Sequence, residues 1–251
     1  MTAQSRDAAM ALWETLQRVE AWTLAQASKT TAAEFARARW ERALRNALSS
    51  ADESVRQKII STLGDPPNLE RLPRGFWDAA QSEYAGVLMP ELEAAFLDSA
   101  RAFIVGQPAI GVSWDLVNLE ASRWARSYTF DLVRGIANTT RDALQEKVGA
   151  YFEIPTPIGV LKDSIGEIFD PVRADMIAIT EVTRAATMGE VAVVNLLESE
   201  SGIEMEAVFH TVNDERVCTR CGPLNGKVVE SDDYAPLHPR CRCVVRHRLK
   251  Q

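Results

Sequence analysis

Apolar residues recur every three or four positions through most of the first 200 residues, which is the pattern of helices that bury one face. Ser/Thr-x-x-Glu sequences begin at Thr31 and Ser50, where hydroxyl and carboxylate groups can satisfy the free N–H groups of a helix start. Together the signals predict helices over residues 5–28, 31–48, 50–64, 76–88, 90–105, 115–136, 139–151, 157–169 and 171–198. In the helix over 115–136, the apolar stripe is expected to be Leu116, Leu119, Trp124, Tyr128, Leu132 and Val133.

The pattern changes after Gly202 to short β-prone runs separated by turn residues. Such runs around Met205–Val212, at Val228-Val229 and at Cys243–Val245 predict a small antiparallel sheet of about three short strands. A sheet of this size is marginally stable alone, so it needs a further source of stability.

The fold class expected from these patterns is mainly α. A helical region over residues 1–105 is followed by a helix-plus-sheet region over 113–251, with the β-module at 203–249. The boundary is placed in the stretch from Gly106 to Val112, where Gly106, Pro108 and Gly111 interrupt the helical pattern.

All four cysteines of the chain lie in the β-module. Cys218 and Cys221 form a C-x2-C pair, and Cys241 and Cys243 form a C-x-C pair. Asn225-Gly226 between the pairs predicts a hairpin turn that would bring them together. Two such pairs have the spacing of a tetrahedral zinc site, and metal binding would stabilise the small sheet.

Other interpretations of the cysteines stay open. They can be free thiols, or they can form disulfides. The N-terminus does not show the basic run and apolar core of a signal peptide, which favours a reducing compartment and therefore metal over disulfides. His238 lies three residues before Cys241 and can replace one cysteine, so five candidates compete for four ligand positions.

Composition narrows the classes of function. Hydrophobic residues make up 46% of the 251 residues, which permits a buried core, and no apolar run is long enough to cross a membrane. The net charge of −7 disfavours nucleic-acid binding by the chain as a whole. The last dozen residues are nevertheless basic, either as a solvated tail or as a weak contact with DNA or an acidic partner.

Four charged residues that precede the cysteines in the sequence have two interpretations. Glu181 and Arg184 share one helix face, and Asp214 and Arg216 precede the first cysteine pair. As a structural joint, these residues would link the helix to the β-module. As an acid–base group, Glu181, Asp214 and His238 would serve a nuclease or transferase. The chain shows no nucleophile motif or phosphate-binding glycine loop, and a site with three or four thiolates is closed to substrate.

Three pieces of sequence carry a resemblance to a known family. They are IAITEVTRA (Ile177–Ala185), NDERVCTRCGPLNGK (Asn213–Lys227) and PLHPRCRC (Pro236–Cys243). In this order and spacing they resemble the phage-Mu-type minor head proteins, a family of phage head-morphogenesis proteins. The likeness is clearest from Met176 to Val245 and extends loosely back to Trp114.

The resemblance implies a non-enzymatic virion component. Such a protein would be made in the bacterial host cytoplasm and would enter the procapsid in few copies. Its partners would be the portal protein and other capsid or scaffold proteins, with no membrane, and its role would be head assembly or DNA delivery. Similar modules look to be fused to toxin domains elsewhere, which keeps the enzyme alternative open.

Overall fold

The computed structural model describes residues 36–105, 112–154, 156–202, 204–212 and 217–250. The chain divides into two compact units, Met1–Ala38 and Arg39–Gln251, and the second contains a helix bundle followed by a small β-module. After a helical segment that ends at residue 63, the elements are η1 (Leu69–Arg71), α2 (Phe76–Val105), α3 (Trp114–Glu153), α4 (Ile158–Ile168), α5 (Pro171–Ser201), β1 (Met205–His210), η2 (Gly222–Leu224), η3 (Ser231–Asp233) and β2 (Val244–Leu249).

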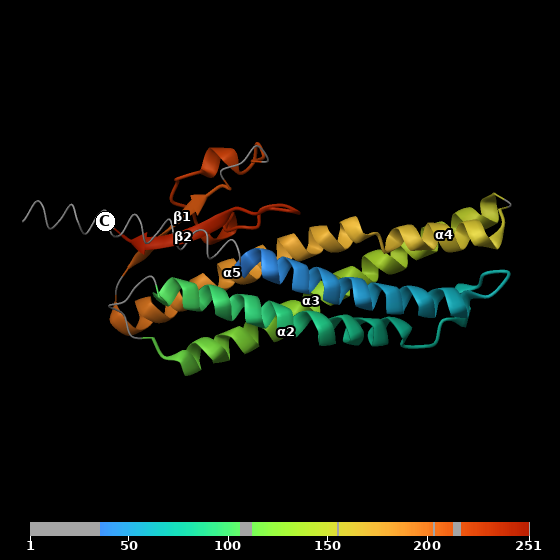
Figure 1. Cartoon of the computed structure of the whole chain (residues 1–251), viewed down its shortest axis with the longest axis horizontal. Coiled ribbons are helices and arrows are strands. Elements are labelled where there is room, and N and C mark those ends of the chain that lie inside the picture. Colours follow the sequence, from blue (N-terminus) through green and yellow to red (C-terminus); the bar gives the residue numbers. More distant parts are fainter. Residues whose placement is uncertain (1–35, 106–111, 155, 203, 213–216, 251) are drawn as a thin grey trace, which may run out of the picture. The chain divides into compact units, whose positions relative to one another are not determined.

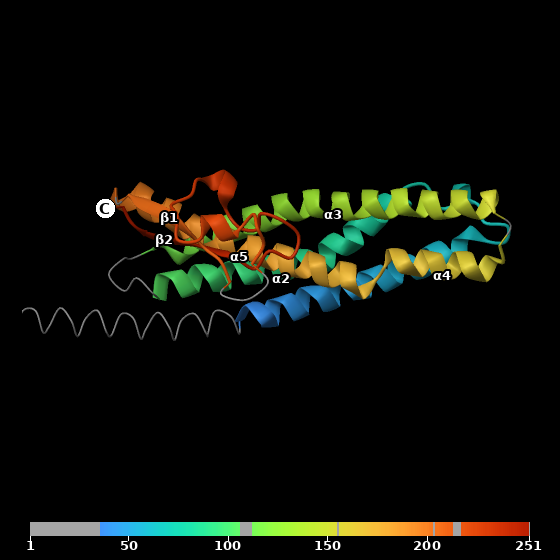
Figure 2. The same ribbon diagram turned by 90° about the horizontal axis from the view of Figure 1, so that it is seen from above.

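Within the second unit, the long helices lie side by side along a common direction (Figures 1 and 2). Helix α2 packs on both α3 and α5, and α4 packs on α3. One apolar core joins the helices, with Leu44, Leu48, Val55, Ile59, Tyr84, Leu88, Leu92, Phe96, Leu144 and Ile165 among its buried members. The β-module lies against α5, at the end of the bundle away from the turn between α3 and α4 (Figure 1).

The predicted helix start at Ser50–Glu53 is wrong, because residues 36–63 form one continuous helix. Leu48, Ala51 and Val55 are all buried, so the apolar face continues through this position. Asp52 is also buried, and its Oδ1 accepts a hydrogen bond of 2.6 Å from the Tyr84 hydroxyl on α2. The acidic side chain therefore bonds across the bundle rather than capping a helix.

The predicted break before Pro90 is also wrong, because α2 runs through it as one helix of 30 residues. Leu88 and Leu92, on either side of the proline, are both fully buried. Keeping this face continuous offsets the roughly 3 kcal/mol that an interior proline costs.

Helix α3 is likewise one helix of 40 residues, although a new helix was expected near Thr139. The Thr139 and Thr140 hydroxyls donate to backbone carbonyls one turn earlier, which threonine does in a helix interior and not at a cap. The predicted stripe is partly wrong, since Leu116 and Leu119 are exposed. The buried face is Val117, Ala121, Ala125, Thr129, Val133, Ile136, Ala137, Thr140, Leu144 and Val148.

The ends of three helices are confirmed. Residue Gly64, after the first helical segment, has φ +74°, which L-residues rarely adopt. Helix α4 follows Pro157, and α5 begins at Pro171 with the Asp170 side chain accepting a bond of 2.6 Å from the Val172 N–H. These helix ends are determined by residues at the ends themselves, and the structure contains all three.

The β-module contains an antiparallel pair, β1 and β2, with Phe209 opposite Val245 and Met205 opposite Leu249. Three strands were expected, but Val228 forms only an isolated bridge to Val208. Its pairing is short because the chain turns into η3 at Ser231. The small core comprises Ala207, Phe209, Cys221, Val229, Ala235, Cys241, Cys243 and Val245.

The turn at Asn225-Gly226 is confirmed, but its type differs from the one expected. Asn225 has φ −55° and ψ 124°, and Gly226 has φ +75°. These angles describe a type II turn, which needs a positive φ only at its second central residue. The Asn225 side chain also accepts a bond of 3.0 Å from the Thr211 N–H, which ties the turn to the end of β1.

Other predictions lie outside the described residues: the helix over 5–28, the capping sequence at Thr31 and most of the break at 106–112. The division into regions 1–105 and 113–251 therefore stays a prediction. None of the described helices has the length and apolar character needed to cross a membrane.

Candidate metal centre

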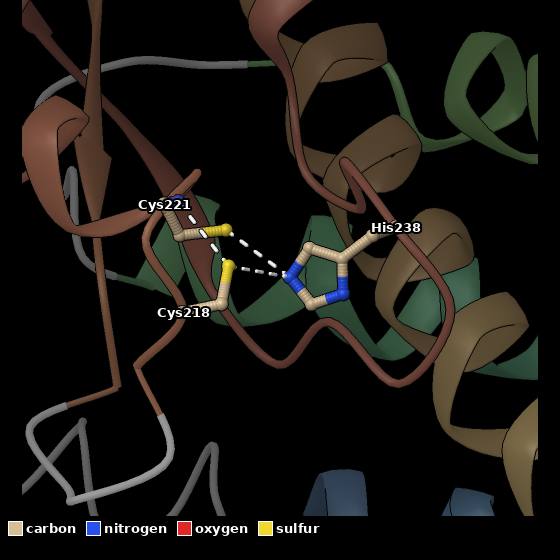
Figure 3. A group of neighbouring side chains, drawn as sticks. All are labelled: Cys218, Cys221 and His238. Carbon is tan, nitrogen blue, oxygen red and sulfur yellow. Dashed lines mark hydrogen bonds between the residues drawn. The ribbon is translucent and has the colours of Figure 1, made fainter.

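The five candidate ligands gather at two loops of the β-module. Cys218 and Cys221 flank the turn that leads into η2, while His238, Cys241 and Cys243 belong to the loop that leads into β2. In Figure 3 the two sulfurs of the first loop and the imidazole of the second point toward one another. The sequence prediction that the two segments approach each other is therefore confirmed.

The ligand atoms fall into two groups of three that share Cys221. In the first, the Nε2 atom of His238 lies 3.2 Å from the Cys218 sulfur and 3.3 Å from the Cys221 sulfur. In the second, Cys221, Cys241 and Cys243 lie within 4.8 Å of one another, with 3.9 Å between the Cys221 and Cys241 sulfurs. The cluster can hold a metal ion, and its donors are of the kinds that zinc and other soft metals prefer.

The surroundings of the thiols favour negative charge on one sulfur from each pair. The Cys221 N–H donates to Cys218 and lowers the pKa of that thiol. A hydrogen bond from Cys243 lowers the pKa of Cys241 to about 5. Burial raises the pKa of Cys221 to about 12, and the bond to Cys241 raises the pKa of Cys243. A cation at the site would offset that penalty for any sulfur that it binds.

His238 is oriented by a bond from its other ring nitrogen. Nδ1 lies 2.7 Å from the Pro239 carbonyl, which raises the pKa of the imidazole and fixes the proton on Nδ1 in the neutral ring. The lone pair of Nε2 then faces the two sulfurs. Metal-binding histidines commonly have such a partner, because it sets both the tautomer and the orientation of the ring.

The loop that carries His238, Cys241 and Cys243 is hydrogen-bonded to α5 through polar side chains that lie on one helix face. The Thr183 hydroxyl contacts the Cys241 carbonyl at 2.7 Å, and the Arg240 N–H donates to the Thr180 hydroxyl at 2.9 Å. Further along α5, the Glu190 carboxylate accepts bonds from the backbone and side chain of His247 and from Arg246. We refer to Thr180, Thr183 and Glu190 as the α5 seat.

Two of the residues expected to form the joint, Glu181 and Arg184, lie within the described parts of the chain. The Glu181 carboxylate accepts a bond of 2.5 Å from Tyr128 on α3, and Arg184 lies 3.4 Å from it. Burial raises the pKa of Glu181, and the bond from Tyr128 partly counters this. Glu181 therefore links α5 to α3. Asp214 and Arg216 lie outside the described residues, so their role as cross partners stays a prediction.

Part of the basic C-terminal stretch forms strand β2, and Lys250 follows directly after it. Three cations of the stretch have partners within the module or on α5. Arg246 pairs with Glu190 at 3.0 Å, Arg248 with Glu206 at 2.6 Å, and Lys250 with Glu204 at 2.7 Å. These ion pairs neutralise much of the positive charge that the sequence places there.

Residues 131–246 match the family model described as Phage Mu protein F like protein. The resemblance found in the sequence is thus confirmed. Comparison with curated proteins and with solved structures finds no match.

The Phage Mu protein F like region begins within α3 and ends within β2. It contains all five candidate ligands and the whole of the α5 seat. The matched residues thus include α4, α5 and most of the β-module.

Sequence reasoning missed the α5 seat within this region. Thr180, Thr183 and Glu190 follow one another at spacings of three and seven, so they share a helix face. Their common position on one face of the helix was the available signal. Glu181 and Arg184 were predicted to form the joint instead, because they are charged and lie beside these residues in the sequence.

Proposed function

We propose that the protein is a minor head protein of a tailed phage or prophage that associates with the portal and acts in procapsid assembly or DNA delivery. The observation that carries the proposal is the match of residues 131–246 to the Phage Mu protein F like family. The acidic net charge and the helical bundle fit a component that binds other proteins rather than nucleic acid. It would be made in the bacterial cytoplasm and enclosed in the virion.

In this proposal the Cys/His cluster holds one structural Zn²⁺ ion. Support comes from the mutual approach of the sulfurs and the His238 nitrogen and from the partner that orients the imidazole. The role of the ion would be to stabilise the β-module on α5. Purified protein should carry about one zinc per chain by elemental analysis.

We further propose that the protein is not an enzyme. The Tyr128 phenol and Arg184 already engage the Glu181 carboxylate, and His238 faces the sulfurs of the cluster. One observation favours the alternative of a nuclease or transferase, namely that the pKa of the buried Glu181 is raised, as it is in many general acids. Hydrolysis of nucleic acid or nucleotide that is lost in Glu181→Gln would establish that alternative.

A candidate surface for the partner is the outer face of α3. Leu116, Leu119 and Phe130 are exposed, and at 100° per residue they lie within about 60° of one another on the helix. Trp124, which the sequence places in the apolar stripe of this helix, stacks on Tyr128 with 5.1 Å between the ring centroids.

The test is co-expression with a candidate portal protein, followed by size-exclusion chromatography. We expect a complex that persists through the column. Leu119→Arg combined with Phe130→Arg should weaken it, while Glu153→Gln, at an exposed position near the end of α3, should not. Failure of the unaltered protein to form any complex with the portal would overturn the proposed function.

A contact with DNA would be weak and would involve β2. Truncation after Val245 would remove most of this strand, so it cannot separate charge from folding. Replacing Arg248 and Lys250 with glutamine leaves the strand and removes two exposed cations. Any retention on duplex DNA at low salt should then fall, with portal association unchanged.

A further inference from the structure

Two turns of the same length present the candidate ligands. In the first, Cys218 and Cys221 are three residues apart, with the Cys221 N–H 3.3 Å from the Cys218 sulfur and the Gly222 N–H 2.9 Å from the Cys218 carbonyl. Backbone bonds of this kind hold a C-x2-C pair so that both sulfurs point to one side of the turn.

The second turn has the same separation but begins at a histidine. The Cys241 N–H donates to the His238 carbonyl at 3.1 Å, which closes a four-residue turn. Pro239 occupies the first central position, and Arg240 occupies the second with φ +61°. Proline and a positive φ at these two positions are the features of a type II turn. His238 and Cys241 are thus the H-x2-C counterpart of Cys218 and Cys221.

Arg240 is the only residue other than glycine with a positive φ in the described parts of the chain. A long side chain in this conformation is strained, and the surrounding structure must hold it there. Its N–H donates to Thr180 and its guanidinium donates to the Val172 carbonyl at 3.2 Å. These bonds to α5 hold Arg240 in its strained conformation and so maintain the turn that presents His238 and Cys241.

Three of the six distances among the ligand atoms of the two turns can be compared with those around a single tetrahedral ion. With metal–sulfur distances of about 2.3 Å and metal–nitrogen distances of about 2.0 Å, two sulfurs lie about 3.8 Å apart and a sulfur and a nitrogen about 3.5 Å apart. The Cys221 and Cys241 sulfurs are 3.9 Å apart, and His238 Nε2 is 3.2 and 3.3 Å from two sulfurs. These three separations are near those of an occupied site. The four ligand atoms do not all lie within 4.8 Å of one another, so the two turns must close further around an ion.

We infer that the metal ligands are Cys218, Cys221, His238 and Cys241, three thiolates and one imidazole, and that Cys243 is not a ligand. This inference rests on the metal site proposed above and specifies which groups bind the ion. Cys243 lies beyond the second turn, directly before β2, in the apolar cluster that also contains Cys221 and Cys241.

A site of four cysteines would leave His238 beside the ion without a bond to it. Cys243 is also close to Cys221 and Cys241, so its distance does not exclude it. With Cys243 as the fourth ligand, His238 Nε2 would lie 3.2 and 3.3 Å from two sulfurs of the site without itself binding the ion. With Nε2 as a ligand, the Pro239 carbonyl at Nδ1 is the partner that metal-binding histidines commonly have.

The test replaces the native ion with Co²⁺ in the full-length protein and records the visible absorption. The spectrum of the unaltered protein should be that of three thiolates and one nitrogen. Cys243→Ser should bind one Co²⁺ with an unchanged spectrum. His238→Ala should change the spectrum and weaken binding by more than the roughly 10–100-fold loss that follows removal of an outer-shell partner.

The variants separate failure of the ligand set from failure of the site. If the unaltered protein binds no Co²⁺ or Zn²⁺, the proposed metal site is wrong and the inference falls with it. If it binds the ion but Cys243→Ser abolishes binding, or His238→Ala leaves the spectrum unchanged, the metal site stands and the ligand set is wrong. Far-ultraviolet circular dichroism of each variant confirms that the helix bundle is intact, so loss of binding reports on the site.

Discussion

The helix bundle and the β-module bury very different groups. Inside the bundle, large apolar side chains such as Leu88, Leu92 and Phe96 are fully enclosed by several helices. The buried cluster of the module has eight residues, and three of them are cysteines. Burial of apolar surface can stabilise the bundle by itself, whereas two short strands with so small a core need cross-links or support. The bundle can therefore be stable by itself, whereas the β-module depends on further contacts.

The dependent part has two sources of support. One is the ion that we propose in the Cys/His cluster, and the other is the α5 seat. They meet at Cys241, whose sulfur faces the cluster and whose carbonyl contacts Thr183. The module should therefore respond to changes in either support, and the bundle should respond to neither.

The largest effect should follow removal of the metal. Structural zinc contributes on the order of 10 kcal/mol to the folding of small metal modules. We expect chelation to expose the amides of β1 and β2 to hydrogen exchange while the helices of the bundle stay protected. Unchanged exchange in β2, in protein shown by elemental analysis to be metal-free, would mean that apolar packing and the α5 seat suffice.

A smaller loss should follow Glu190→Ala. Glu190 is 2% exposed and accepts bonds from the His247 N–H and from Arg246, so its removal leaves a buried donor without a partner. We expect the module to lose about 2–3 kcal/mol of stability, measured from hydrogen exchange of β2. The matched control is Glu206→Ala, whose ion pair with the exposed Arg248 should contribute less than about 1 kcal/mol.

A change at Gly189 tests the opposite side of α5. A Cβ atom there would lie 2.2 Å from the Phe96 carbonyl oxygen on α2, so the two helices must move apart. We expect Gly189→Ala to lower the free energy of unfolding of the bundle by about 1–3 kcal/mol.

Gly135→Ala is the control for Gly189→Ala. This position lies within α3, and a Cβ atom would meet nothing within 4 Å. Alanine should stabilise the helix there by roughly 0.5–1 kcal/mol. Equal effects of the two substitutions in chemical denaturation would contradict the close packing of α2 on α5.

The sequence predicted what depends on neighbours along the chain. The end at Gly64, the start at Pro171 and the approach of the two cysteine segments all follow from local spacing, and the structure contains them. The breaks expected at Pro90 and Thr139 failed because continuous buried faces outweighed a local signal. Which helix faces become buried is decided by partners that are distant in sequence, so periodicity alone cannot fix it.

In the candidate site, too, features that depend on residues near in the chain were predicted, and those that depend on distant residues were not. Ligand spacing identified the cysteines and His238 because a metal constrains residues that are near one another in the chain. The α5 seat was missed, since Thr183 and Cys241 are 58 positions apart and neither residue type indicates such a contact. Glu181 was noticed for its charge, but its bond with Tyr128 joins residues 53 positions apart.

The smallest effect concerns that Glu181–Tyr128 bond, which belongs to the bundle. Burial raises the pKa of Glu181 in the folded protein above its ordinary value of 4.5. The native state therefore binds this proton more tightly than the unfolded state, and stability falls as pH rises from about 4.5 through the folded pKa. Glu181→Gln cannot ionise, so the difference in stability should shift toward the variant as pH rises over this window.

Unfolding free energies from the helical signal, measured from pH 4 to pH 8, test this expectation. Asp52 is also buried with a raised pKa, but it is present in both proteins and its contribution cancels in the difference. Glu153→Gln controls for the change in net charge, because this residue is exposed near the end of α3. A difference between Glu181→Gln and the unaltered protein that is constant with pH would show that Glu181 is solvated. The link between α3 and α5 would then resemble a surface contact.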